Sequence, residues 1–81
     1  MTRSVFTKEY ELFRSLLVKA RLESGLTQVE LAEALDRPQS FVSKFERGER
    51  RLDVIEFLQV MEALSLDPLG FLRSFRSTSR N

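Results

Sequence analysis

The feature that most constrains this 81-residue chain is the helical spacing of its apolar residues, interrupted by short breaks. In residues 9–23 apolar side chains recur three and four positions apart with charges between them, the pattern of an amphipathic helix. Breaks follow at Gly25, at residues 36–38, at Gly48 and at residues 65–68, and no run has strand periodicity. We therefore expect an all-α chain with helices over about residues 9–23, 27–35, 38–47, 53–64 and 67–75, and a frayed tail over residues 76–81.

Signals at the expected helix starts support these boundaries. Thr27 and Glu30 have the spacing of a capping box, in which each side chain accepts a hydrogen bond from the other residue's backbone amide. Pro38 suits the first turn of a helix, and Asp53 is a candidate cap. Only three residues separate the second and third helices, which predicts two short helices meeting at a steep angle.

Length and composition limit the class of protein. With 42% hydrophobic and 31% charged residues, the chain is typical of a single compact globular domain over residues 1–81, with a thin core. It has no Cys, which excludes disulfides and thiolate metal sites. No apolar run approaches the roughly 18 residues of a membrane span, and acidic residues come too early for a signal peptide. A cytoplasmic protein with no membrane contact is expected.

The charges are unevenly distributed along the chain. Residues 37–51 contain five basic and two acidic residues, whereas residues 52–72 contain four acidic residues and no basic one. This asymmetry predicts a basic region that meets an anion and a separate acidic region. Chance fluctuation over short segments is the alternative explanation.

The third expected helix has two chemically different sides. At 100° per residue, Phe41, Val42 and Phe45 lie on one side, while Ser40, Ser43, Lys44 and Arg47 lie on the other. Such a helix is either a solvated surface helix or one that places its polar side in a groove of DNA.

Several motifs occur together in the order of one known family. The segments GLTQ, ELAEAL and QSFVSKFERGER, followed by an apolar helix, resemble the helix-turn-helix domain of the Cro and lambda-repressor type, the XRE-like regulators. The resemblance covers about residues 10–75. It implies a five-helix, lambda-repressor-like DNA-binding domain in which residues 27–35 cross the DNA backbone and residues 38–47 form the recognition helix in the major groove.

The resemblance also assigns candidate base contacts. Gln39 stands at the family's first base-reading position, where its amide can pair with adenine, and Lys44 can donate to guanine. Ser40 and Ser43 carry short hydroxyls suited to bases or phosphate. Phe41 belongs at the edge of the core or against a thymine methyl group. The alternative for the polar residues is a solvated helix surface.

Candidate DNA backbone contacts lie at both ends of the motif. Gln28 begins the second helix, where the positive helix end favours a phosphate. Arg47, Arg50 and Arg51 follow the recognition helix and are candidate phosphate contacts, although runs of charge are often only solvated.

Two further residues are assigned a structural role by the resemblance. Arg21 and Glu46 correspond to an ion pair between the first and third helices. The chain departs from the family pattern at Asp36, where Gly is usual, and at Pro38, where a capping Ser is usual. Asp accepts the left-handed conformation less readily than Gly, and Pro38 leaves the start of the recognition helix uncertain by one residue.

One domain of this size contacts too few base pairs for selective binding, so we expect a homodimer. Surplus apolar residues in the fourth helix and the C-terminal segment are its candidate interface, with Phe71 assigned to the core instead. The expected interface residues are Ile55, Leu58, Leu69, Leu72 and Phe75.

These observations predict a sequence-specific regulator of transcription, a repressor that binds double-stranded DNA at a two-fold symmetric operator. Without His or Cys, and without a phosphate-binding loop, no enzyme, cofactor or small-molecule substrate is expected. Three alternatives remain: an antitoxin with a toxin protein as partner, a restriction-modification controller, and an adaptor that binds protein rather than DNA.

Overall fold

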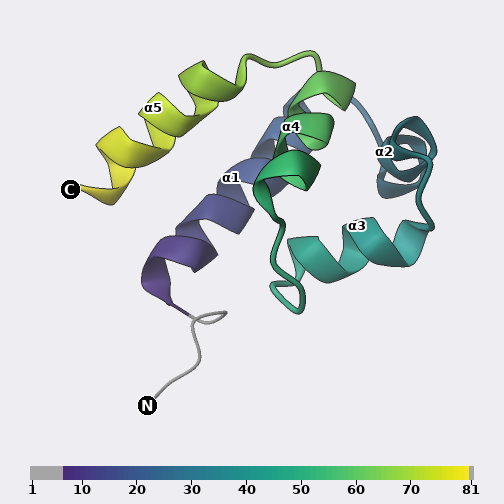
Figure 1. Ribbon diagram of the computed structural model, residues 1–81, viewed down its shortest axis with the longest axis horizontal. Coiled ribbons are helices and arrows are strands. Elements are labelled where there is room, and N and C mark those ends of the chain that lie inside the picture. The colour runs from purple at the N-terminus through teal and green to yellow at the C-terminus, as the bar shows by residue number, and fades with distance from the viewer. Residues whose placement is uncertain (1–6, 81) are drawn as a thin grey trace.

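A computed structural model describes residues 7–80, and these fold into five α-helices with no strand among them (Figure 1). The all-α fold with a helix-turn-helix is therefore confirmed. The turn between the second and third helices has the expected three residues. The helices are α1 (Lys8–Glu23), α2 (Gln28–Leu35), α3 (Gln39–Glu46), α4 (Val54–Ala63) and α5 (Pro68–Ser79).

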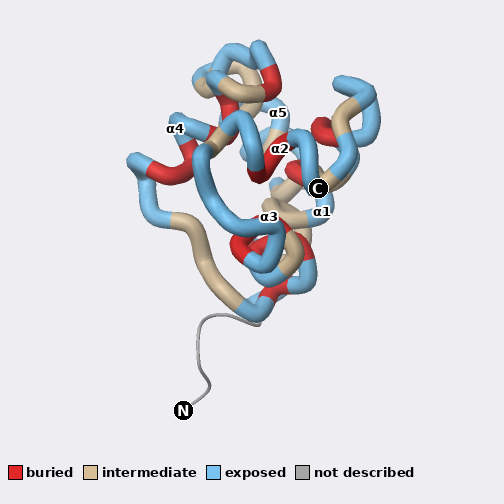
Figure 2. Tube along the Cα trace, turned by 90° about the vertical axis from the view of Figure 1, so that its right-hand side faces the viewer, coloured by how far each residue is buried: buried red, intermediate tan, exposed pale blue. Residues whose placement is uncertain are grey.

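The core lies among the first four helices. Helix α1 packs against α3 and α5, and α2 packs against α3 and α4. All the buried residues of the helices belong to α1 through α4, and α5 contributes none (Figure 2). The core cluster consists of Leu17, Ala20, Leu31, Ala32, Phe41, Val42, Phe45, Phe57, Val60, Met61 and Leu64.

Side-chain caps fix where most of the helices begin. Thr27 accepts a hydrogen bond from the Glu30 amide at 3.0 Å, and the Glu30 carboxylate accepts one from the Thr27 amide at 2.9 Å. Asp53 and Glu56 form the same reciprocal arrangement at the start of α4. Both capping boxes satisfy amide groups that have no partner within the helix, so these sequence signals place the helix starts to within a residue.

The turn between α2 and α3 is closed by backbone geometry. Asp36 adopts the left-handed conformation, with φ of 57°, and the Arg37 amide donates to the Ala32 carbonyl at 3.0 Å. Pro38 precedes α3 in an extended conformation and supplies no side-chain cap. Helix α3 therefore begins at Gln39, one residue later than expected, and Asp36 takes the left-handed conformation at the position where the family usually has Gly.

Helix α5 is longer than the sequence pattern indicated. It extends to Ser79, so the prediction of a frayed tail is wrong for residues 76–79, and Asn81 lies outside the described residues. Phe75 packs edge-on against Phe13 with ring centroids 5.6 Å apart, which anchors the helix at the predicted end. No Gly or Pro follows Gly70 within α5, so nothing in the sequence stops the helix there. Phe71 contacts the rings of Phe13 and Phe57 and joins the core, as expected.

Candidate nucleic-acid interface

Helix α3 is divided into a buried side and a polar side. Phe41, Val42, Phe45 and Glu46 are buried. Of the four candidate base contacts, the structure leaves Gln39, Ser40 and Lys44 exposed and Ser43 partly exposed. The side-chain positions follow from the spacing in the sequence, because residues three and four apart share a face of a helix.

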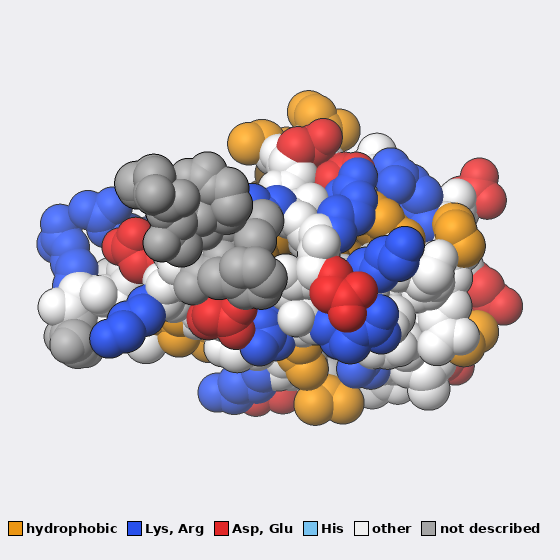
Figure 3. All heavy atoms as spheres, turned by 90° about the horizontal axis from the view of Figure 1, so that it is seen from below, with side chains coloured by type: hydrophobic (Ala, Val, Ile, Leu, Met, Phe, Trp, Pro, Cys, Tyr) orange, Lys and Arg blue, Asp and Glu red, His pale blue; other side chains and the backbone are white. Residues whose placement is uncertain are grey.

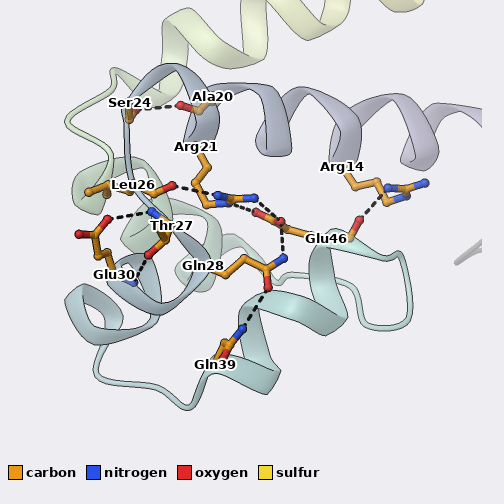
Figure 4. Close-up of polar contacts among 10 residues, drawn as sticks. All are labelled: Arg14, Ala20, Arg21, Ser24, Leu26, Thr27, Gln28, Glu30, Gln39 and Glu46. Atoms are coloured by element: carbon orange, nitrogen blue, oxygen red, sulfur yellow. Dashed lines mark hydrogen bonds and ion pairs between the residues drawn. The ribbon is translucent and has the colours of Figure 1, made fainter.

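A buried ion pair joins α3 to α1. The Arg21 Nε lies 2.7 Å from Glu46 Oε2, and the Arg21 Nη2 donates to Glu46 Oε1 at 3.1 Å (Figure 4). The structure therefore contains the pair that the resemblance assigned. Arg21 also donates to the Leu26 carbonyl at 2.9 Å, and Arg14 donates to the Glu46 carbonyl at 2.7 Å. Two arginines of α1 thus hold the C-terminal end of α3 and the chain leading into α2.

The same carboxylate connects to the candidate DNA contacts. Gln28 donates from Nε2 to Glu46 Oε1 at 2.9 Å, and its Oε1 accepts a hydrogen bond from Gln39 Nε2 at 3.3 Å (Figure 4). The starts of α2 and α3 are therefore joined through two amide side chains. The Gln28 side chain, which we expected to be free for a phosphate, is half-buried and uses both ends of its amide within the protein.

The exposed Arg47 is paired locally. Its guanidinium donates to the Glu49 carboxylate at 2.8 and 3.1 Å, and it also donates to the Ser43 hydroxyl. The hydrogen bond from Arg47 lowers the pKa of Glu49. Both side chains are more than half exposed, so a DNA phosphate could replace Glu49 at little cost.

Arg50 is held more firmly, by a carboxylate from α4. Its two terminal nitrogens donate to Glu56 Oε1 and Oε2, each at 2.8 Å, and Arg37 Nη2 lies 3.6 Å from the same carboxylate. The hydrogen bonds from Arg50 lower the pKa of Glu56 to about 2, with smaller contributions from the Asp53 amide and from the charge of Arg37. The segment expected to form a separate acidic region thus supplies a carboxylate to the basic segment, because the fold brings α4 beside the loop that follows α3.

Arg51 is placed differently from Arg50. Its guanidinium carbon lies 4.4 Å from the centre of the Tyr10 ring, and the Tyr10 hydroxyl accepts a hydrogen bond from the Leu52 amide at 3.2 Å. The Arg51 Nε is buried and has no hydrogen-bond partner among residues 7–80. Tyr10 of α1 therefore supports both the guanidinium and the loop that carries it.

Only two cations of residues 37–51 form no ion pair with any residue in the described part of the chain, and these are Lys44 and Arg51. Figure 3 views the molecule from below, the side on which α3 lies in Figure 1, and shows Lys and Arg side chains gathered over that part of the molecule. Lys44 and Arg51 leave unneutralised positive charge, which favours contact with a phosphate or with the acceptors of a guanine edge.

The expected dimer surface is apolar and open. Ile55, Leu58, Leu69 and Leu72 are exposed, with Ile55 at 63% and Leu69 at 65%. A hollow of about 260 Å³ lies between α4 and α5, with Leu58, Leu69 and Leu72 in its lining. Phe75 differs from these four residues because it is half-buried against Phe13 in its own chain.

Residues 7–80 were also compared with the requirements of a metal site and of a membrane-spanning helix. No group of three or more His, Cys, Asp or Glu residues is arranged to hold a metal ion in that range. None of the described helices combines the length and the apolar character needed to cross a membrane.

Four residues of this region were not singled out from the sequence: Tyr10, Arg14, Arg37 and Glu56. The capping-box spacing of Asp53 and Glu56 was a local signal, and it would have shown that Glu56 faces the start of α4. The Tyr10 hydroxyl meets a residue 42 positions away, so no local pattern could have revealed that contact.

Comparison with known proteins gives a consistent result. The chain matches the helix-turn-helix family over residues 17–71. An XRE-family like protein from Pseudomonas syringae is 47% identical, with 86% of this chain and 85% of that one covered and a TM-score of 0.83. The ClgR regulator of the clp gene from C. glutamicum is 25% identical over 89% and 94% of the two chains, with a TM-score of 0.77.

The restriction-modification controller protein C.Esp1396I has the same fold at lower identity. Its wild-type structure is 23% identical, with 93% of this chain and 99% of that one covered and a TM-score of 0.83. It has also been solved as a tetramer in complex with its natural 35 base-pair operator. A search of curated proteins by sequence gave no match.

Proposed function

Because this chain belongs to the XRE family of helix-turn-helix proteins, we propose that it binds a specific double-stranded DNA sequence and represses transcription by occupying it. The observation that carries the proposal is the orientation of α3. Its apolar side and Glu46 are fixed in the protein, which leaves the polar side exposed in one defined position. A rigid polar helix of this kind suits the major groove.

In the proposed complex, Gln39, Ser40, Ser43 and Lys44 read base edges. The hydrogen bond between Gln28 and Gln39 holds the Gln39 amide at the start of α3, which favours the paired geometry that an adenine requires. Lys44 carries a free ammonium group on the exposed side and donates to a guanine acceptor.

The phosphate contacts surround this helix. Arg51 is the strongest candidate, since Tyr10 supports its guanidinium and no carboxylate neutralises it within the described residues. Arg47 contributes by exchanging Glu49 for a phosphate. Gln28 contributes through its backbone amide at the positive end of α2, since its side chain is hydrogen-bonded to Glu46 and Gln39. Arg50 makes the weakest phosphate contact, because Glu56 already holds it.

The active form in this proposal is a homodimer. The exposed apolar residues of α4 and α5, with the hollow between the helices, form a surface that a second copy covers by two-fold symmetry. The controller protein solved as a tetramer on its operator has the same fold, which supports repeated copies along DNA. Two copies double the number of bases read and provide the selectivity that one domain lacks.

Selection of duplexes from a random pool, at near-physiological salt, tests this proposal. Enrichment of an inverted repeat is the expected result, since two symmetric copies read the same half-site. A selected pool with no enriched sequence, bound only at low salt, would contradict both base reading and the dimer on DNA.

Single variants then separate the roles of the two unpaired cations. Lys44→Ala should weaken binding to the selected site by about 1 to 3 kcal/mol and relax the preference at one base position. Arg51→Ala should weaken binding to all duplexes alike and lower the salt slope by about one. Lys19→Ala, an exposed position on α1, is the matched control and should change neither quantity. Uniform weakening by Lys44→Ala would show that it contacts only phosphate.

A further inference from the structure

Glu56 occupies a central position beside α3 although it belongs to α4. It is 7% exposed, and its carboxylate accepts hydrogen bonds from both terminal nitrogens of Arg50 and from the Asp53 amide. Arg37 completes the cluster at 3.6 Å. One carboxylate therefore connects the turn before α3, the loop after α3 and the start of α4.

The same two arginines enclose a residue of α3. The guanidinium carbon of Arg37 lies 4.4 Å from the centre of the Phe41 ring, and that of Arg50 lies 4.9 Å from it. Phe41 is buried in the first full turn of α3, three positions before the exposed Lys44. Contact between a guanidinium and an aromatic face is favourable, and each arginine here meets a ring and a carboxylate at once.

This cluster compensates for a missing constraint at the start of α3. Pro38 forms no side-chain hydrogen bond there, so the N-terminal turn of the helix has no cap of the kind found at α2 and α4. The C-terminal end is held instead by Arg14 and by the pair of Arg21 and Glu46. The N-terminal half of α3 is connected to α4 through the cluster of Phe41, Arg37, Arg50 and Glu56.

We propose that Glu56 is a positioning residue for base reading, which sets the orientation of α3 by holding Arg37 and Arg50 against Phe41. This inference rests on the proposed function. Hydrogen bonds to base edges need correct placement of Gln39 and Lys44, whereas phosphate contacts tolerate displacement. Loss of the cluster should therefore reduce selectivity more than it reduces general affinity for DNA.

The test compares the wild-type protein with Glu56→Gln on the selected site and on a random duplex at the same salt. Glutamine keeps an oxygen that can accept from the Asp53 amide but loses the charge that holds Arg37 and Arg50. We expect affinity for the selected site to fall about tenfold, with a change of less than about threefold on the random duplex. Glu62→Gln, an exposed position of the same helix, is the matched control and should change neither.

A second readout uses the free protein. Backbone amide chemical shifts of Gln39, Ser40 and Lys44 should move in Glu56→Gln and remain unchanged in Glu62→Gln, because only the first variant alters the orientation of α3. Unmoved shifts with an unchanged preference for the selected site would overturn the inference. Equal weakening on both duplexes would do the same, since it would indicate a loss of folded protein or of phosphate contact.

Arg37→Gln provides a test that does not depend on the behaviour of Glu56→Gln. It leaves the two hydrogen bonds between Arg50 and Glu56 in place, so the fold should persist. Reduced selectivity supports the inference that the cluster positions α3. Equal weakening on both duplexes identifies Arg37 as a phosphate contact and contradicts the inference. If the wild-type protein selects no sequence, the proposed function fails first and this inference fails with it.

Discussion

Helices α3 and α5 are both amphipathic, yet they are attached to the protein in opposite ways. Four of the eight residues of α3 are buried, and polar side chains of α1 and α2 form hydrogen bonds to its last residue, Glu46. None of the twelve residues of α5 is buried, and α5 contacts the core through the half-buried rings of Phe71 and Phe75. Burial on one helix fixes the direction of a polar surface, whereas incomplete burial on the other leaves an apolar surface exposed.

The largest difference should appear when one aromatic ring is removed from each helix. Phe45→Ala in α3 removes a side chain that is 1% exposed and should lower the free energy of unfolding by about 3 to 5 kcal/mol. Phe71→Ala in α5 should cost about half as much, because its site is open to solvent and part of the surface is already hydrated. Urea denaturation of both variants measures the free energy of unfolding. Equal losses of this free energy would contradict the contrast between the two helices.

Loss of the charge on Glu46 should be the next largest effect. Glu46→Gln leaves Arg21 buried without its anion and should lower the free energy of unfolding by about 3 kcal/mol. Glu23→Gln is the matched control, since Glu23 pairs with Lys19 at 4.0 Å on the exposed surface of α1, the helix that also carries Arg21. This substitution should lower the free energy of unfolding by less than about 0.5 kcal/mol. Similar values from denaturant titrations would show that the buried pair contributes little to holding α3.

Acid should weaken the attachment of α3 through Glu56. The pKa of Glu56 is about 2, against an ordinary value of 4.5, so the carboxylate's contribution to stability is complete above about pH 4.5 and is lost as the pH falls toward 2. The free energy of unfolding of the wild type should therefore exceed that of Glu56→Gln by about 2 kcal/mol at pH 7. Denaturation at pH 7, 4 and 2.5 should show this gap closing, and a gap that persists at pH 2.5 would contradict the assignment.

The smallest effect on the monomer should come from the exposed side of α5. Leu69→Gln alters a side chain that is 65% exposed and should change the free energy of unfolding of the monomer by less than about 0.5 kcal/mol. If a second copy covers this surface, the same variant should raise the dimer dissociation constant about tenfold. Sedimentation equilibrium measures the dimer dissociation constant and so distinguishes this effect from a change in monomer stability. Leu22→Gln on α1, at 62% exposure, is the control. An unchanged dissociation constant would place the interface elsewhere.

Local signals in the sequence predicted much of the framework. Helical periodicity predicted the five helices, and the capping box at Thr27 and the candidate cap at Asp53 predicted two helix starts to within a residue. The end of α5 was predicted four residues too early, because polar residues 76–79 carry no strong helix signal of their own. The packing of Phe75 against Phe13, 62 positions away in the sequence, was not visible in that local pattern.

The sequence by itself determined the helices and which side of α3 is polar, because both depend on neighbours within a few positions of the chain. The tertiary structure decided which charges remain free. Arg50 and Arg51 are adjacent and chemically identical, yet Glu56 neutralises the first and the Tyr10 ring supports the second. A charge is neutralised by an opposite charge within a few ångströms of it, and only the folding of α1 and α4 around this loop set those distances.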